Sequence, residues 1–450
     1  MTLSFFGAAG GVTGSCVLLE TPREKIMIDC GFFQGDKQLE EKNDDPFPFN
    51  PPELSAVILT HAHLDHCGRI PRLCAEKLRC PIYTTAPTLD LAEFILLDAA
   101  EISVHRSKRS GRPSLYTPAD VHGSMRHFTP IAYHEEVRVG PDVSFHLIDA
   151  GHILGSASIV VRAEGKTIVF SGDLGNTPAP IIRPTEYPDH ADIAIIETTY
   201  GDRLHHGRED RRETLKAAFQ KTINEKGVLL IPAFAMERTQ ELLHEIDHFI
   251  EHQEIPAIPV FLDSPLAIEL THVFEKHVAF YGEKERQHFS YDNFYKFPSF
   301  EMTATQEDGR MIEQTPPPKV IIAGSGMLQG GRILGHAARY LPSSTTTLLI
   351  VGYQAEGTLG RRLLDGEKRV RINGREIDIR AHIEEIDAYS AHADQKQLLT
   401  WLQHIHPTPL KIFLTHGEPT PSRVFAEKVK LSFGIDATIP REGLSYILAS

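Results

Sequence analysis

One stretch decides the fold of this chain, and it follows directly on the apolar run Ala56–Leu59: Thr60-His61-Ala62-His63-Leu64-Asp65-His66. A strand over the apolar run would bring the next residues to one rim of a sheet. A turn there can direct His61 and His63 at one metal ion, because residues two apart on an extended chain share a face. Asp65 and His66 come after the turn and suit a second metal ion. Imidazole nitrogens with carboxylate oxygens favour zinc over calcium or magnesium.

The composition describes a globular protein with either two cores or one core and a large insert, because 450 residues exceed one ordinary domain. The net charge of −14 argues against generic electrostatic binding to nucleic acid, but it leaves room for a local basic cleft. The five cysteines include no Cys-x-x-Cys pair, which favours a reducing compartment. Without a signal peptide or an apolar run near the ~20 residues that span a bilayer, we expect a cytoplasmic protein with no membrane contact.

The first thirty residues predict short strands that end at a buried carboxylate. Leu3–Gly7 is expected to form a strand, and Cys16–Leu19 and Lys25–Ile28 a hairpin-like pair. A dinucleotide fold is disfavoured, because no Gly-x-Gly-x-x-Gly motif opens a helix. Asp29 follows the last of these strands, where an unpaired carboxylate would be costly. It could cap the following turn or support a metal site through hydrogen bonds.

Further candidate ligands follow strands later in the chain. The segment from Val137 to Gly175 reads as consecutive strands, two of which lead to His152 and to Asp173. Before them, helical patterns cover Ile70–Lys77 and Thr88–Ser103. The basic segment His105–Arg112 is expected to be a loop that is either solvated or in contact with a phosphate backbone.

Beyond the strand that ends at Glu197 the pattern changes. Helices and strands alternate from Glu209 to His277, which is typical of a parallel α/β sheet with crossover helices. A polar, aromatic loop is expected over Tyr281–Pro318, followed by a strand and the glycine-rich segment Gly324–Arg332. The β-rich character returns near Ile377. His392 then precedes the expected helix Gln395–Gln403, and the expected strand Lys411–Leu414 leads to His416.

Taken together, these motifs resemble those of the β-CASP ribonucleases of the metallo-β-lactamase superfamily, relatives of the pre-mRNA 3′-end cleavage endonuclease. Asp29, the His61–His66 block, His152 and Asp173 match the four superfamily motifs in order. Glu197, His392 and His416 match three further motifs of the β-CASP group. The resemblance covers nearly the whole chain.

The resemblance implies an αβ/βα four-layer sandwich made of two stretches, residues 1–203 and 379–450, with an inserted α/β β-CASP domain at 204–378. It also implies two Zn²⁺ ions per chain: His61, His63 and His152 on one, Asp65, His66 and His416 on the other, and Asp173 bridging, with Asp29 as hydrogen-bonding support. A bridging hydroxide would attack phosphorus. His392 is the candidate general acid, oriented by Glu197, and Asp65 counts with them as catalytic.

The glycine-rich segment carries the candidate substrate contacts. Backbone N–H groups at a helix start favour anions, and Arg332 can bind phosphate in a bidentate manner. The alternative is that the glycines serve close backbone packing. Ser325, Gly326 and Arg332 are therefore candidate RNA contacts.

The resulting hypothesis is a zinc-dependent RNA endonuclease, with 5′→3′ exonuclease activity and homodimer formation left open. A DNA nuclease of the same fold is one alternative, although the DNA-directed members lack the histidine matched by His416. A small-molecule metallo-hydrolase for lactones, thioesters or β-lactams would need neither the insert nor Glu197 and His392. A flavin-linked diiron oxidoreductase would replace His63 by glutamate, and an inactive scaffold would have lost ligands.

Overall fold

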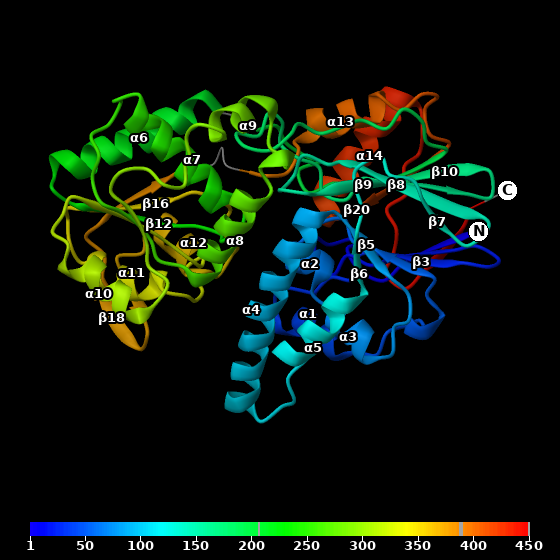
Figure 1. Cartoon of the computed structure of the whole chain (residues 1–450), viewed down its shortest axis with the longest axis horizontal. Coiled ribbons are helices and arrows are strands. Elements are labelled where there is room, and N and C mark those ends of the chain that lie inside the picture. Colours follow the sequence, from blue (N-terminus) through cyan, green and yellow to red (C-terminus); the bar gives the residue numbers. More distant parts are fainter. Residues whose placement is uncertain (206–207, 387–389, 449–450) are drawn as a thin grey trace. The chain divides into compact units, whose positions relative to one another are not determined.

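The computed structural model describes residues 1–205, 208–386 and 390–448 and divides into two compact units. The first unit comprises Met1–Leu204 and Ala391–Ser450, and the second comprises His205–Ser390 (Figure 1). The first unit is therefore built from two separate stretches of chain. It contains the His61–His66 block.

Two mixed sheets form the centre of the first unit. One contains, in spatial order, β21 (Ser445–Ile447), β1 (Thr2–Phe5), β2 (Val17–Glu20), β3 (Lys25–Ile28), β4 (Ala56–Ile58), β5 (Ile82–Thr84) and β6 (Phe128–Pro130). The other contains β20 (Lys411–Thr415), β11 (Ile193–Glu197), β10 (Lys166–Phe170), β9 (Ala157–Ala163), β8 (Val143–Asp149) and β7 (Val137–Val139). The C-terminal stretch contributes an edge strand to each sheet, because β21 pairs with β1 and β20 with β11.

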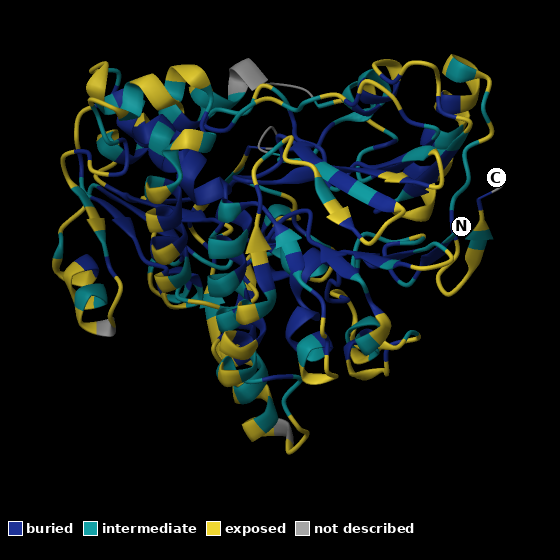
Figure 2. Cartoon of the chain, turned by 45° about the vertical axis from the view of Figure 1, so that its right-hand side comes forward, coloured by how far each residue is buried: buried dark blue, intermediate teal, exposed yellow. Residues whose placement is uncertain are grey.

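Strand alternation divides the second sheet between two cores. In β10, Ile168 and Phe170 pack in the cluster that joins the two sheets, whereas Val169 packs on the opposite face with Trp401 and Phe425 of the C-terminal helices. Side chains on a strand point alternately to opposite faces, so a continuous apolar run is buried on both sides. The inner strands β9 and β11 are accordingly buried almost throughout, and Figure 2 marks buried residues in dark blue.

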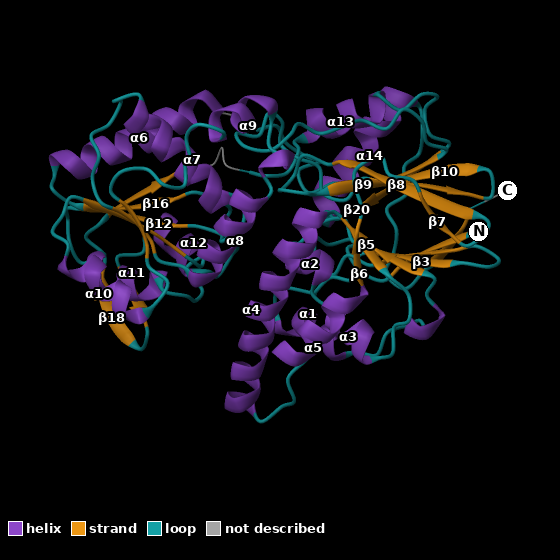
Figure 3. Cartoon of the chain, in the orientation of Figure 1, coloured by secondary structure: helices purple, strands orange, loops and turns teal. Residues whose placement is uncertain are grey.

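Helices lie on the outer face of each sheet (Figure 3). On the side of the second sheet these are α13 (Gln395–Gln403) and α14 (Pro419–Phe433). The segments between strands of the first sheet form α1 (Lys37–Glu41), α2 (Leu64–Cys67), α3 (Ile70–Ala75), α4 (Ala86–Ser110) and α5 (Pro118–Ser124), with 3₁₀ turns at Lys42–Asp44, Pro51–Glu53 and Met125–His127. The αβ/βα four-layer core expected from the sequence is confirmed.

The second unit is the α/β sheet expected from the alternating pattern. Its six strands pair in parallel in the order β14 (Phe300–Met302), β13 (Val260–Leu262), β15 (Lys319–Ala323), β12 (Val228–Pro232), β16 (Thr346–Ile350) and β19 (His382–Glu385). The helices are α6 (Arg208–Asn224), α7 (Arg238–Glu251), α8 (Pro265–Lys276), α9 (Glu283–Phe289), α10 (Gln306–Gln314), α11 (Ile333–Tyr340) and α12 (Leu359–Leu364), with a 3₁₀ turn at Val278–Phe280. A separate hairpin is formed by β17 (Arg369–Ile372) and β18 (Arg375–Asp378).

Two expectations about local structure are wrong. The basic segment expected as a loop at His105–Arg112 mostly continues α4, which ends at Gly111 in the left-handed conformation (φ 73°). Lys108 and Arg109 lie in its last turn, where positive charge interacts favourably with the negative end of the helix dipole. The expected loop Tyr281–Pro318 contains α9, β14 and α10, and the last of these begins with a capping box at Thr305.

The second unit extends further along the chain than residue 378, the end expected from the sequence. The strand β19 (His382–Glu385) belongs to it, because it pairs in parallel with β16. Within the ranges that the structure describes, every helix is too short or too polar to cross a membrane.

Candidate metal centre

The predicted ligands of the second sheet converge because their strands run the same way. β8 and β10 are each antiparallel to β9, and β10, β11 and β20 are mutually parallel. Their carboxyl ends therefore share one edge. The residues at or just beyond those ends are His152, Asp173, Glu197 and His416.

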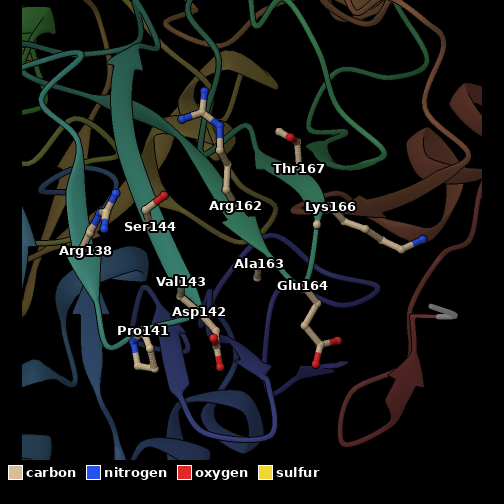
Figure 4. A pocket seen from close by; sticks show the side chains of 11 residues that line it. Arg138, Pro141, Asp142, Val143, Ser144, Arg162, Ala163, Glu164, Lys166 and Thr167 are labelled. Carbon is tan, nitrogen blue, oxygen red and sulfur yellow. The ribbon is translucent and has the colours of Figure 1, made fainter.

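The first sheet supplies the other ligands from one turn. His61 and His63 follow β4, and Asp65 and His66 lie in the single turn of α2. The pocket in Figure 4 lies away from this edge, because Asp142, Val143 and Lys166 line it at the amino ends of β8 and β10.

One group of candidate ligands comprises His61, His63, His152 and Asp173. His63 Nδ1 lies 3.0 Å from His61 Nε2 and 3.2 Å from His152 Nε2. Asp173 Oδ2 lies 3.5 Å from His61 Nε2 and 3.7 Å from His152 Nε2. Ligands at about 2.1 Å from a tetrahedral zinc ion stand ~3.4 Å apart, so this spacing suits one ion.

The other group comprises Asp65, His66 and His416. Asp65 Oδ2 lies 3.3 Å from His416 Nε2. Asp173 again lies alongside, with Oδ2 3.4 Å from His66 Nε2 and Oδ1 3.5 Å from His416 Nδ1. Asp173 therefore lies between the two groups, where a bridging carboxylate would be required.

Unpaired polar atoms at the centre fit a bound cation. His66 Nε2 and Asp173 Oδ1 are buried and have no hydrogen-bond partner among the described residues. Leaving such atoms unpaired in the interior costs free energy. Coordination to a metal would remove that cost, and the nitrogen and oxygen donors match the preferences of zinc.

Asp29 supports the ligands by hydrogen bonding. Its Oδ2 lies 2.7 Å from His66 Nδ1, and its Oδ1 accepts from the Thr60 N–H at 2.8 Å. The Thr60 hydroxyl donates to Asp29 at 2.9 Å and lies 3.0 Å from His61 Nδ1. One carboxylate and one hydroxyl thus orient a ligand of each group.

Sequence reasoning missed three of these supporting groups. The Thr60 hydroxyl, the Thr199 hydroxyl at 3.1 Å from His416 Nδ1, and the Ala391 carbonyl at 3.2 Å from His152 Nδ1 all contact ligand rings. The position of Thr60 directly before His61 was an available signal for one of them. Nothing local marks Thr199 or Ala391, because they contact ligands more than 200 positions away in the sequence.

Burial keeps the three imidazoles of the first group uncharged. Burial lowers the pKa of His61 and His152 well below the ordinary imidazole value, and lowers the pKa of His63 to about 4. These three rings are therefore unprotonated at neutral pH, the state that binds metal.

The two carboxylates of the centre, Asp65 and Asp173, carry negative charge. Burial raises the pKa of Asp65, but a hydrogen bond from His416 and the charge of His66 outweigh it and lower that pKa to about 2. Burial also opposes the charged form of Asp173, yet the neighbouring imidazoles of His416 and His66 hold its pKa well below the usual value. Both carboxylates are ionised at neutral pH and can bind cations.

His392 and Glu197 form a pair beside the ligands. His392 Nδ1 lies 3.2 Å from Glu197 Oε1 and 3.9 Å from Asp173 Oδ2. Glu197 is fixed by the backbone, since it accepts from the N–H groups of Leu174 at 2.7 Å and Thr199 at 3.3 Å. Burial lowers the pKa of His392, but the charge and hydrogen bond of Glu197 outweigh this and raise it to about 9. His392 also lies in ligand range of His416, so its position fits either an acid or a metal ligand.

The three expected substrate contacts lie in the second unit. The Ser325 hydroxyl accepts from the N–H groups of Gln329 and Gly330, at 3.0 and 3.2 Å, so it organises the glycine-rich loop. Close packing accounts for Gly326, because a Cβ there would lie 2.8 Å from the Phe234 ring.

Arg332 already has acceptors within the second unit. Its guanidinium donates to Asp263 Oδ1 at 2.6 Å and to the Thr303 and Ala304 carbonyls at 2.8 and 2.6 Å. A phosphate would have to compete with these groups. RNA contact by Ser325, Gly326 and Arg332 stays a prediction.

Comparison with protein families gives three matches in chain order. The metallo-beta-lactamase superfamily matches residues 9–222, the Beta-Casp domain 239–363, and the Zn-dependent metallo-hydrolase RNA specificity domain 376–440.

Comparison with individual proteins points the same way. Ribonuclease TTHA0252 of Thermus thermophilus is 39% identical over 88% of this chain and 90% of its own. The RNase J-like protein of Methanocaldococcus jannaschii is 31% identical over 98% of both chains. Transcription termination factor FttA of the same organism is 33% identical over 97% of this chain and 70% of its own.

A solved structure supports the fold alone. The crystal structure of a protein of unknown function from Enterococcus faecalis V583 superimposes with a TM-score of 0.59, at 14% identity, over 99% of each chain.

Proposed function

Since this chain belongs to the β-CASP ribonucleases of the metallo-β-lactamase superfamily, which are metal-dependent RNA hydrolases, we propose that it uses two zinc ions to cut RNA internally. The observation that carries the proposal is the position of Asp173 between two groups of candidate ligands. The match to an RNA specificity domain over residues 376–440 supports RNA over DNA. The presence of His416, which completes the second group, also supports RNA, because the DNA-directed members resemble one another in lacking this histidine.

Two zinc ions bound there would supply an activated water and neutralise charge on the phosphodiester. The protein contributes the arrangement of its own groups. His61, His63 and His152 are uncharged and buried or partly buried, so they can bind cations without adding positive charge. Asp65 and Asp173 are ionised, and Asp29 with Thr60 holds ligands of both groups in place.

A proton must reach the leaving oxygen when the phosphodiester bond breaks. His392 suits this role because its Nδ1 lies 3.2 Å from Glu197 Oε1, and an imidazolium carries a second proton on Nε2. Glu197 also stabilises the imidazolium, as the direction of the His392 pKa indicates. Replacement of Glu197 should therefore affect proton transfer more than metal binding.

The test uses circular single-stranded RNA, which has no end for an exonuclease. We expect the purified protein to linearise it, chelator to stop the reaction, and added Zn²⁺ to restore it. A DNA circle of the same sequence should stay intact. Degradation of linear RNA only, with circles untouched, would contradict an endonuclease and leave the 5′→3′ exonuclease. Equal cleavage of both circles would contradict RNA specificity.

The number of ions is tested through Asp173. Because this carboxylate lies between the two groups, Asp173→Ala should lose two zinc equivalents relative to the wild type. Elemental analysis of both proteins measures this difference. An unchanged zinc content, or full activity with one equivalent lost, would overturn the dinuclear centre.

Homodimer formation and a cytoplasmic location stay predictions, and light scattering measures the former.

A further inference from the structure

The second unit contains its own group of candidate metal ligands. Asp247 and Glu251 lie four positions apart on α7, and His288 on α9 is followed four positions later by Asp292. The Asp292 N–H donates to the His288 carbonyl at 3.0 Å, so the helical spacing continues to that residue. Residues four apart share a helix face, and the four candidate ligand atoms lie within 4.8 Å of one another.

Two buried atoms in this group have no protein partner. Asp247 is only 4% exposed. Its Oδ2 and the Nε2 of His288 are buried without a hydrogen bond in the part of the chain that the structure describes. Burying a carboxylate oxygen in this way is costly unless a cation or donor satisfies it.

The negative charge of the neighbouring carboxylates also favours a bound cation. Burial raises the pKa of Asp247 to about 7, and the negative charges of Asp292 and Glu251 raise it further. The imidazoles of His288 and His252 oppose this shift without reversing it. Three carboxylates therefore repel one another around one buried oxygen.

The spacing of the atoms suits coordination better than hydrogen bonding. His288 Nε2 lies 3.5 Å from both Glu251 Oε2 and Asp292 Oδ2 and forms a hydrogen bond with neither. Ligands at about 2.1 Å from a tetrahedral ion stand ~3.4 Å apart. The ligand groups around Asp173 have the same separation, as in the 3.5 Å between Asp173 and His61.

We propose that Asp247, Glu251, His288 and Asp292 bind a divalent transition-metal ion, for which Zn²⁺ is the representative, and that this ion links α7 to α9. The imidazole favours zinc or its first-row neighbours over calcium and magnesium, which prefer all-oxygen sites. The Glu251 and Asp292 side chains are 42% and 43% exposed, so the ion can enter from solvent.

The expected consequence is local order at α9. This helix has only seven residues, and isolated helices of that length are marginal in water. Phe289 of α9 also packs against Phe294 at a ring separation of 5.1 Å. An ion shared with α7 would add a cross-link between two helices.

The test compares full-length wild type with Asp247→Asn and His288→Gln after removal of metal and dialysis against Zn²⁺ alone. Each variant should bind one zinc equivalent fewer by elemental analysis. Zinc should also slow amide hydrogen exchange over residues 283–292 in the wild type and not in the variants. Glu283→Gln, which removes an exposed carboxylate on α9 outside the group, should behave as the wild type.

The proposed ion uses none of the ligands around Asp173. RNA cleavage by Asp247→Asn should therefore equal that of the wild type. Asp247→Asn conserves size and removes a buried charge, so it should fold. Equal zinc content in the wild type and both variants would overturn the proposal. Zinc-dependent protection of residues 283–292 that persists in both variants would overturn it as well.

Discussion

His392 and His416 look alike in the sequence but have different partners in the structure. His392 Nδ1 lies 3.2 Å from Glu197, a carboxylate that the backbone fixes in place. His416 instead lies between Asp65 at 3.3 Å and the Thr199 hydroxyl at 3.1 Å. The roles proposed for these two histidines, acid for His392 and ligand for His416, should therefore be separable by single substitutions.

Replacement of His392 should affect the chemical step and leave the metals. His392→Ala is expected to keep both zinc ions of the centre and to cut RNA 10²–10⁴-fold more slowly, the usual range for positioned proton transfer. RNA with sulfur as the leaving atom needs little protonation and should largely restore the rate. Loss of zinc, or no recovery with the sulfur substrate, would show that His392 is not the acid.

His416→Ala serves as the contrasting variant. Its ring faces Asp65 and Asp173, so its removal should lower zinc content together with activity. Elemental analysis and cleavage assays on the same preparation give both values. Wild-type zinc content in this variant would remove His416 from the ligands.

The pH dependence of RNA cleavage follows from the raised His392 pKa. A general acid must be protonated, so kcat/KM should fall as pH rises through about 9. The imidazolium form is fully present at lower pH, so this group imposes no loss near neutrality. The decline should be absent in His392→Ala, measured against the residual rate of that variant. An identical alkaline decline in both proteins would assign it to another group.

At the scale of elements, the turn that carries the ligands depends on one close backbone contact. A Cβ on Gly31 would lie 1.5 Å from the Asp65 carbonyl oxygen and 2.6 Å from the His66 nitrogen. The Arg69 guanidinium donates to the Gly31 carbonyl at 2.7 Å, which holds the two segments together. The position of α2 is thus set by a glycine outside the histidine block.

Gly31→Ala should therefore push α2 out of place. We expect a loss of about 1–3 kcal/mol in the free energy of unfolding, typical of overpacking, together with weaker zinc binding through Asp65 and His66. Denaturant unfolding and zinc titration measure the two effects. Gly11→Ala is the matched control, because a Cβ there meets no atom within 4 Å. Equal behaviour of the two variants would contradict this account of α2.

At the scale of the molecule, the first unit needs the end of the chain. β20 pairs with β11 along its whole length, and β21 pairs with β1. Trp401 of α13 and Phe425 of α14 are buried against the second sheet. The same stretch carries His392 and His416.

A chain that ends at Asp378 should consequently fail as a metal enzyme. Its second sheet would expose β11 as an edge and leave the apolar face under α13 and α14 uncovered. We expect loss of near-ultraviolet circular dichroism and of the zinc ions of the centre. A well-folded truncated protein with wild-type zinc and RNA cleavage would contradict the two-stretch core.

Local sequence determined most of the strands and the α/β alternation, and the resemblance to the β-CASP ribonucleases added the set of candidate ligands. Apolar runs such as Ala56–Leu59 and the His61–His66 block are short-range patterns, and a strand end is where a side chain meets the rim of a sheet. The identity of each donor is a property of its residue. These features therefore need no knowledge of distant contacts.

The tertiary structure alone decided which atoms meet. Thr199 and Ala391 contact ligand rings through strand pairings across more than 200 positions, and α7 meets α9 only after the second unit has folded. The end of α4 and the helices and strand within Tyr281–Pro318 also depended on helix caps and packing, which hydrophobic periodicity does not indicate. The physical reason is that hydrogen bonds and burial join residues by distance in space, whereas a pattern records only distance along the chain.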